Sequence, residues 1–422
     1  MTQMHGETEA ISTPLATEDQ EYVERIAARL RRDPRVQAAI ARVEAHWREA
    51  MAPNEEHLDR FPAEYEQAAF CGLMNAANED PLRPRIHAFA RLAHRLGDDE
   101  IPATKSGHPN PDYIYRFAPI EGASEYVIEG QMPPGRPIAF EVAMLTAEQA
   151  YQKNLSLSAL HVEEDGSFTL TIGPRAEGDN PNHFESNAQS VQMLIRDVIS
   201  DPANQSPIAL TIRRLGPEPT RPSHSFDEMA AAAERHIRKH VDDLVFVTRN
   251  FVLTTPANSF GSPKIHQESM YSVAQAYAPG HYRLSDGEAL LISLTLGTAL
   301  YAVVPVSNFW GGVGNLLERP VAIGTGRAKP NPDGGYTFVV SHQDPGVANW
   351  VDPDGLHEGV IFLRWIGFSD GGTEAKPPRL EVEALPFDAL RERVPAIVPR
   401  LTPEERQAEH AEWRRHYERV MG

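Results

Sequence analysis

The segment "NPDYIYR", residues 110–116, carries side chains that could do proton-transfer chemistry. A phenol beside a guanidinium can have a lowered pKa and then act as a base or a proton donor. An arginine also holds a phenolate, a carboxylate or a developing alkoxide. We therefore predict catalytic roles for Tyr115 and Arg116, and substrate-binding roles for Asn110, Asp112 and Tyr113.

A β-strand is expected to position these groups. Pro111 has no N–H and biases Asn110 towards an extended conformation. Alternation then places one set of side chains on each face: Asp112, Ile114 and Arg116 on one, Tyr113, Tyr115 and Phe117 on the other. Two interpretations are open. Either the aromatic face is core and Asp112 pairs with Arg116, or a tyrosine hydroxyl and Arg116 project into a cavity between two β units.

A second segment, "KIHQESMYS", supplies His266, Glu268 and Tyr271 at what looks like the matching place in a repeated unit. Aligning Tyr271 with Tyr115 puts a carboxylate three residues before a tyrosine in both copies. Histidine titrates near neutrality, so His266 is the leading candidate for a general acid or base. We predict catalytic roles for all three residues; the alternative for His266 is a hydrogen-bonded loop residue.

A third segment, "SNFWGGVGN", places Asn308, Phe309 and Trp310 before a glycine-rich loop. An aromatic pair beside a flexible loop suits a lid or pocket wall for a flat ligand, so these three residues are predicted to bind substrate. The alternative is a β-turn with core aromatics.

No metal site and no cofactor are predicted. His236 and His240 have the i, i+4 spacing that can hold one ion, but the charged surroundings "ERHIRKHVDD" favour a solvated helix face. His266, His281 and His342 have no ligand spacing among themselves. The signatures of P-loops, zinc proteases and α/β-hydrolases are absent.

Length and charge limit the classes of function. The chain has 422 residues, enough for two or three domains, and a net charge of −19. Such an acidic surface repels phosphate backbones and anionic lipid, so neither nucleic acid nor a membrane is expected as a partner. Cys71, the single cysteine, is expected to be a buried structural thiol. Because no intramolecular disulfide is possible and no secretory signal is evident, we expect a cytoplasmic protein.

The pattern along the chain predicts an α+β fold: a helical N-terminal region, two tandem jelly-roll-like β-sandwich units and a C-terminal helix. The predicted organisation is a disordered tail at 1–20, a helical region at 21–100, a first β-sandwich unit at 105–220, a linking helix at 225–255, a second β-sandwich unit at 260–385 and a C-terminal helix at 400–422. Further helices are expected at 80–96 and 187–200, the latter as an insertion in the first unit.

An internal repeat supports the two β units. "EDGSFTLTIGP" is matched by "PDGGYTFVVSH", "PNHFESN" by "VANWVDP", and "IALTIRRL" by "VIFLRWIG", in the same order. Several matches in one order indicate a single unit used twice.

The second half resembles the bacterial family called domain of unknown function 1214. The resemblance rests on Asn331-Pro332-Asp333-Gly334 with Tyr336, on Asn349-Trp350 and on Arg364-Trp365, and it covers roughly residues 105–370. The helical region and the C-terminal helix depart from the usual pattern and are candidates for setting the oligomeric state or roofing a pocket. Members often occur beside aromatic or steroid catabolism, which implies an aromatic substrate.

From these observations we expect a cofactor-independent lyase or hydrolase that acts on a small aromatic, lignin-like substrate in a cleft between the β units. Retro-aldol or β-elimination chemistry needs only acid–base groups and a charge-stabilising arginine. The alternative is a non-catalytic small-molecule-binding or scaffold protein. A homodimer is expected.

Overall fold

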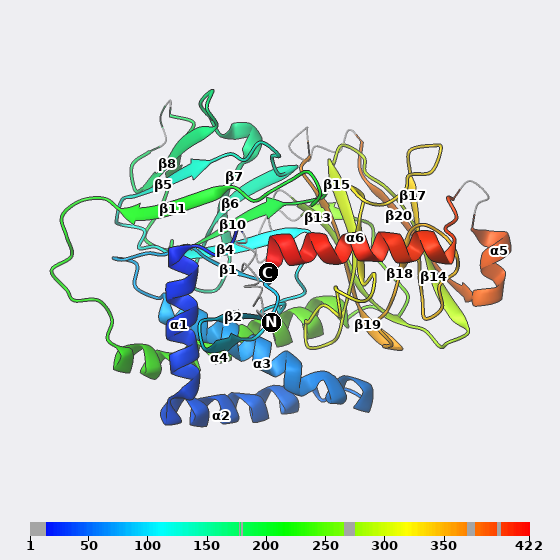
Figure 1. Ribbon diagram of the computed structural model, residues 1–422, viewed down its shortest axis with the longest axis horizontal. Helices are drawn as coiled ribbons and strands as arrows, with labels where there is room; N and C mark the ends of the chain where they lie inside the picture. The colour runs from blue at the N-terminus through cyan, green and yellow to red at the C-terminus, as the bar shows by residue number, and fades with distance from the viewer. Residues whose placement is uncertain (1–13, 177, 179, 266–274, 369–375, 395–397) are drawn as a thin grey trace, which may run out of the picture.

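The computed structural model describes residues 14–422 except 177, 179, 266–274, 369–375 and 395–397 (Figure 1). It confirms the predicted α+β class: helices lie at both ends of the chain, with two β-sandwich units between them. None of the helices in the described part of the chain is both long and apolar enough to cross a membrane.

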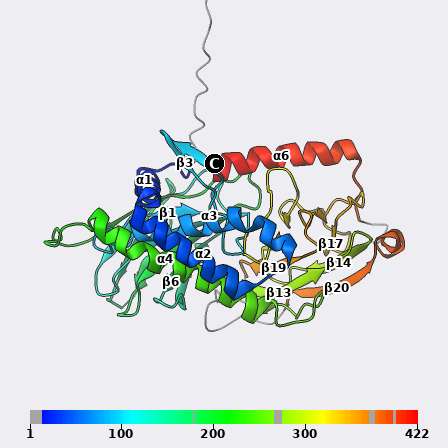
Figure 2. The same ribbon diagram turned by 90° about the horizontal axis from the view of Figure 1, so that it is seen from below.

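The helical region combines N-terminal helices with the linking helix. Its members are α1 (Glu18–Arg32), α2 (Pro34–Met51), α3 (Glu55–Ala77) and α4 (Phe226–Val247), which is followed by a π-helical turn at Thr248–Val252. Ser225 and Glu228 form the capping box that starts α4. α2 and α4 lie side by side (Figure 2), and Trp47, Phe61 and Trp310 are fully buried among these helices.

The helix predicted at 80–96 does not form. Residues here form the short strands β1 (His87–Phe89) and β2 (His94–Leu96), and β2 pairs with β3 (Asp99–Ile101). Pro81 and Pro84 lack the N–H groups that a helix needs, and β1 gains hydrogen bonds by pairing with β4 (Tyr113–Pro119).

Each β unit contributes nine strands to the described chain. The first unit holds β1, β4 (Tyr113–Pro119), β5 (Tyr126–Gln131), β6 (Ala139–Leu145), β7 (Tyr151–Ser156), β8 (Ser167–Gly173), β9 (His183–Glu185), β10 (Gln192–Val198) and β11 (Ala209–Arg214). The second holds β12 (Lys264–Ile265), β13 (Gln275–Arg283), β14 (Glu288–Thr295), β15 (Tyr301–Ser307), β16 (Ala322–Gly324), β17 (Tyr336–Ser341), β18 (Trp350–Val351), β19 (Glu358–Ile366) and β20 (Arg379–Pro386).

The sheet orders confirm the internal repeat. The five-stranded sheets run β1-β4-β10-β6-β7 and β12-β13-β19-β15-β16, and the four-stranded sheets run β9-β8-β5-β11 and β18-β17-β14-β20. Both four-stranded sheets begin with a parallel pair, β8 with β9 and β17 with β18, whereas the other pairs are antiparallel.

The helix predicted at 187–200 is wrong, and the repeat shows what forms in its place. This segment contains β10, the central strand that corresponds to β19, so β11 corresponds to β20 and not to β19 as the sequence suggested. Most of β10 is buried because it lies in the middle of a covered sheet, and a strand buried on both faces shows no clean alternation.

Each unit has a core between its two sheets. In the first unit, Ile128, Phe168 and Leu170 pack against Val142 and Ile195. A separate and larger core joins the second unit to the outer face of β4 and to the C-terminal helix α6 (Pro403–Met421). The short helix α5 (Leu390–Arg393) precedes α6, which starts at Thr402 with the predicted capping box to Glu405.

A buried ionic network ties these parts together. Asp112 stands just before β4 in the first unit, and its carboxylate accepts hydrogen bonds from Tyr301 Oη (2.6 Å) and Arg327 Nη2 (2.5 Å) of the second unit. Arg327 also donates to Tyr417 Oη of α6 at 2.9 Å and lies over the ring of Trp413. Burial raises the pKa of Asp112, and the positive charge of Arg327 opposes this.

We expect Asp112→Ala to lower the free energy of unfolding by about 3–5 kcal/mol, because it leaves the buried Arg327 guanidinium without its carboxylate. Urea denaturation followed by circular dichroism measures the change. The exposed pair Glu129–Arg213 gives a matched control: Glu129→Ala should cost about 0–1 kcal/mol. Equal losses in the two variants would contradict a special role for the buried network.

Candidate functional site

A cavity of about 510 Å³ lies between helices α3 and α4 and the strands β1 and β4. Its volume falls in the range typical of small-molecule sites. Exposed lining residues, among them Gly107, Val191 and Arg235, connect the cavity to the surface. The cavity therefore separates the helical region from the first β unit, whereas the sequence suggested a cleft between the two β units.

One wall of the cavity is aromatic. Phe89 on β1 pairs with Tyr115 on β4, and His87 pairs with Phe117, in the antiparallel ladder. The rings of Phe89 and Phe117 are stacked with centroids 4.9 Å apart, and the Tyr115 ring lies 5.0 Å from Phe89. Side chains at every second position of a strand share one face, so these rings lie next to one another on the same face of the sheet.

The opposite wall is polar and comes mainly from α4. His236, Lys239, His240 and Asp243 follow one another at i, i+3, i+4 and i+7, the spacing of a single helix face. Lys239 Nζ lies 3.0 Å from Asp243 Oδ2. Ser106 Oγ lies 2.9 Å from His240 Nε2, and burial lowers the pKa of His240 to about 4. The imidazole is therefore neutral at physiological pH.

Glu79, just beyond the end of α3, anchors one edge of this wall. Arg235 Nη2 donates to Glu79 Oε2 at 2.8 Å, and His236 Nε2 lies 2.7 Å from the same oxygen. Burial acts to raise the pKa of Glu79, but the hydrogen bonds with His236 and Arg235 outweigh it and lower the pKa to about 2. Glu79 is thus an ionised partner that is held in place by Arg235 and His236.

The inner end of the cavity is formed by α3 and β1. Asn78 Nδ2 donates to His87 Nδ1 at 2.9 Å, and burial lowers the pKa of His87 to about 4. Asn75 Oδ1 is buried without a hydrogen-bond partner among the described residues, so it is available to a donor on a ligand. Burial raises the pKa of Cys71 to about 12, so this thiol is not a nucleophile.

Of the residues predicted on "NPDYIYR", Tyr115 lies on the cavity wall. Its hydroxyl accepts a hydrogen bond from the backbone N–H of Asn110 at 2.9 Å. Asn110 Oδ1 in turn accepts from the backbone N–H of Asp112 at 3.0 Å. Asn110 and Asp112 are buried and hold the turn and the ionic network described above; neither lines the cavity.

Arg116 does not project into the cavity and does not pair with Asp112. It points into the sandwich of the first unit, where it forms an ion pair with Asp197 of β10 and donates to the carbonyl of Ile208 at 2.6 Å. A buried arginine needs a carboxylate partner. The sequence did not indicate Asp197 as this partner, because the segment that contains it was predicted to be a helix.

Tyr113 is 1% exposed and lies where the two β units meet. Packed polar side chains fill this place: Arg196 pairs with Glu141 at 2.6 Å, and Gln275 Nε2 donates to Glu141 Oε2 at 3.1 Å across the two units. The contact between the units at this point is thus a buried hydrogen bond from Gln275 to a carboxylate that is ion-paired within the first unit.

Asn308, Phe309 and Trp310 pack against α3. Asn308 Nδ2 donates to Glu64 Oε1 at 2.7 Å, Trp310 Nε1 donates to the carbonyl of His57 at 2.6 Å, and Phe309 stacks on the His57 ring. This matches the interpretation of a turn with core aromatics. None of the three lines the cavity.

The predicted catalytic residues His266, Glu268 and Tyr271 lie outside the described residues. The described ladder does define the counterpart of Tyr115. Tyr115 lies opposite Arg196, and Tyr277 lies opposite Arg364, so Tyr277 corresponds to Tyr115 in the second unit.

Sequence reasoning missed Ser106 and placed His236 and His240 on a solvated face. Both histidines border the buried stripe of α4 that contains Ile237 and Val241. Their position beside this stripe was the available signal, because residues that flank an apolar stripe lie at the edge of a packing interface. Ser106 carried no comparable signal.

Comparisons with known proteins show the fold alone. No family model matches the sequence, and no curated protein matches it. The crystal structure of an uncharacterized protein from Burkholderia cenocepacia is similar, with a TM-score of 0.69 and 20% identity over 84% of this chain and 98% of that chain. A protein of Vibrio parahaemolyticus gives a TM-score of 0.40 and 12% identity over 65% of this chain and 90% of that chain.

We expect His87 to make stability depend on pH. Its folded-state pKa of about 4 lies below its unfolded value, so only the unfolded chain gains the proton between roughly pH 6.5 and 4. Stability is then lost as pH falls through this range, by about 2 kcal/mol for His87 on going from pH 7 to 5. The cost of His87→Gln, measured by urea denaturation, should therefore be about 2 kcal/mol smaller at pH 5 than at pH 7. The same cost at both values would contradict this assignment.

Proposed function

We propose that the protein is a cofactor-independent enzyme, a hydrolase or a lyase, that acts on a small aromatic compound by general acid–base chemistry. The proposed site is the cavity between the helical region and the first β unit. The observation that carries the proposal is the pairing of two unlike walls: a row of packed aromatic rings opposite a helix face of ionisable groups.

The aromatic wall supports a flat substrate. Phe89, Tyr115 and Phe117 form an aromatic wall against which an aromatic ligand can pack edge-to-face or offset-stacked, and such contacts contribute about 0.5–1.5 kcal/mol each beyond the area buried. The unpartnered Asn75 Oδ1 fits a hydroxyl or amine donor of that ligand. A phenol-like compound satisfies both requirements. The resemblance to the domain of unknown function 1214 family, itself a proposal, points to the same class of compound.

Ser106 and His240 support the chemistry. With the His240 Nε2 lone pair towards Ser106, the imidazole can accept the hydroxyl proton as Ser106 Oγ attacks an ester carbonyl carbon. The imidazolium then returns the proton to the departing alcohol as the ester C–O bond breaks, and water hydrolyses the acyl-enzyme and frees Ser106, which is a hydrolase mechanism. Alternatively His240 takes a proton from the substrate itself, which is the first step of an elimination or a retro-aldol cleavage. A base of pKa about 4 is weak but always deprotonated, so correct positioning must supply much of the rate.

Lys239 and Asp243 supply charge next to this pair. Burial raises the pKa of Asp243, and Lys239 opposes that shift. The ammonium of Lys239 can stabilise negative charge that develops on a substrate oxygen.

Non-catalytic binding is the second candidate function. Its support is that most polar groups of the cavity already have partners: Glu79 holds Arg235 and His236, and Asp243 holds Lys239. A site of this kind can bind a ligand without bond-breaking chemistry.

We also propose that the protein acts in the cytoplasm as a homodimer. The single cysteine, which is buried, supports a reducing compartment. Size-exclusion chromatography with light scattering tests the assembly: a discrete dimer agrees with the proposal, and a monomer or a large assembly contradicts it.

The proposal is tested first by ligand binding. A thermal-shift screen of aromatic acids, lignin-type dimers and steroids should give at least one ligand that raises the melting temperature. Phe89→Ala should weaken that ligand roughly 2–10-fold because one stacking surface is lost. Phe246→Ala is the matched control, because Phe246 is 44% exposed and lies outside the cavity. Equal weakening in both variants, or no ligand at all, would contradict the cavity as the site.

Turnover of the bound compound separates enzyme from binding protein. His240→Gln should lower kcat roughly 10²–10⁴-fold while ligand affinity changes little. Ser106→Ala should abolish turnover in a hydrolase and leave most of it in a lyase. If the wild type binds the compound but converts none of it, the protein is a binding protein and the catalytic proposal fails.

A further inference from the structure

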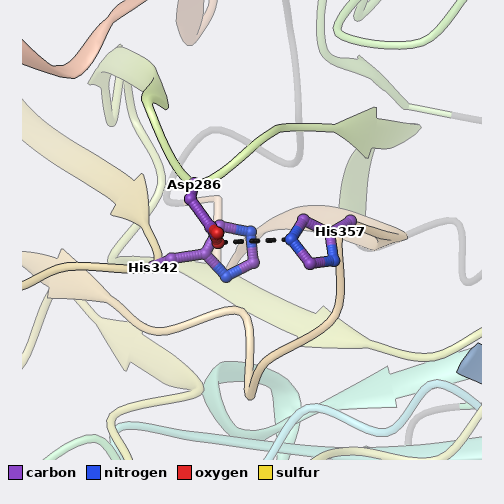
Figure 3. Close-up of side chains that lie close together, drawn as sticks. All are labelled: Asp286, His342 and His357. Atoms are coloured by element: carbon purple, nitrogen blue, oxygen red, sulfur yellow. Dashed lines mark hydrogen bonds and ion pairs between the residues drawn. The ribbon is translucent and has the colours of Figure 1, made fainter.

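Three loops of the second β unit bring Asp286, His342 and His357 together (Figure 3). Asp286 lies in the turn before β14, His342 follows the last residue of β17, and His357 precedes the first residue of β19. One potential ligand atom from each residue lies within 4.8 Å of the other two. These residues do not line the cavity described above.

The two histidine rings border the same small space and are tilted by 38° relative to each other. Their centroids are 4.6 Å apart, and His357 Nε2 lies 3.2 Å from Asp286 Oδ1. In a tetrahedral zinc site with bonds near 2.1 Å, neighbouring ligand atoms are roughly 3.4 Å apart. The pair of His357 and Asp286 already has this spacing, and the third ligand needs to approach by roughly 1.4 Å or less.

Glu56 on α3 determines which nitrogen of His357 faces this space. Glu56 Oε1 lies 2.9 Å from His357 Nδ1, and the backbone N–H of His357 donates to the same carboxylate at 3.1 Å. A carboxylate that accepts from one ring nitrogen directs the lone pair of the other outward, as in carboxylate–histidine–zinc arrangements. The outward nitrogen, Nε2, then faces the carboxylate of Asp286.

Two lone pairs that face each other at 3.2 Å need a positive charge between them. A proton on His357 would satisfy the pair of His357 and Asp286 but would leave His342, whose Nε2 lies 3.4 Å from the carbonyl oxygen of Leu284, outside that interaction. A metal ion uses all three groups. Two imidazoles with one carboxylate suit zinc and similar divalent transition metals better than calcium or magnesium, which prefer oxygen ligands only.

We propose that Asp286, His342 and His357 bind one divalent transition-metal ion, for which zinc fits best, and that Glu56 orients His357 from behind. Three protein ligands leave a fourth tetrahedral position for water or another small ligand. Because Glu56 belongs to α3 and the ligands belong to the second β unit, the bound ion also strengthens the contact between these two parts.

Isothermal titration of the purified chain with zinc chloride after chelator treatment tests the proposal. We expect a site in the wild type that His342→Ala and His357→Ala each weaken at least tenfold, and that Glu56→Gln weakens roughly 10–100-fold. His161→Ala is the matched control, because His161 also lies beside an exposed carboxylate, that of Glu163, and no third ligand group joins this pair among the described residues. This control should bind zinc as the wild type does.

Spectroscopy of the cobalt-substituted protein gives a second measurement. Cobalt bound by two imidazoles and a carboxylate should show visible absorption bands that zinc displaces and that are absent in the His342→Ala, His357→Ala double variant. Wild-type affinity in the His342 and His357 variants, equal loss in His161→Ala, or unchanged cobalt bands in the double variant would each overturn the proposal.

Discussion

The ion pair of Asp112 with Arg327 is the interaction on which the arrangement of the molecule depends. A carboxylate and a guanidinium without contact to water must pair, since either one alone costs several kcal/mol. Here the partners come from different β units, and Tyr417 of the C-terminal helix joins them. The close approach requires a glycine, because a side chain at Gly324 would place its Cβ 2.3 Å from Asp112 Oδ2. The network therefore fixes the two units and α6 in one relative position.

The ion pair of Asp112 with Arg327 also affects the cavity, because Asp112 immediately precedes β4. Its pairing therefore sets where the strand begins and which face each later side chain occupies. Tyr115 and Phe117 then fall on the face that looks towards the helices, and Arg116 falls inside the sandwich with Asp197. A shift of one residue would exchange these faces. The stacked rings of the cavity wall thus depend on a charge pair at the start of the strand.

Local patterns in the sequence were sufficient for the α+β class, the repeated unit, the start of α6 and the two faces of β4, because each follows from neighbouring residues. Patterns failed where long-range packing decides. The segment of β10 was predicted to be helical from its composition, but it forms a central strand that pairs with β4. Residues 87–89 form the strand β1 because they pair with β4. The Ser106–His240 contact and the cluster of Asp286, His342 and His357 join residues far apart in the chain, so no spacing rule could find them.

The two β units share one strand order, yet the corresponding arginines Arg196 and Arg364 have different partners. Arg196 pairs with Glu141 at the junction of the units, whereas Arg364 donates to the backbone carbonyl of His108 at 2.6 Å. The corresponding tyrosines also differ in their surroundings. Tyr115 lines the cavity, whereas Tyr277 is buried and donates a hydrogen bond to Gln275. A tandem duplication explains this pattern: once a fold exists twice in a chain, one copy can give up close packing on its outer face while the other retains it. The cavity wall around Tyr115 and the packed surface around Tyr277 then derive from the same surface of one ancestral unit.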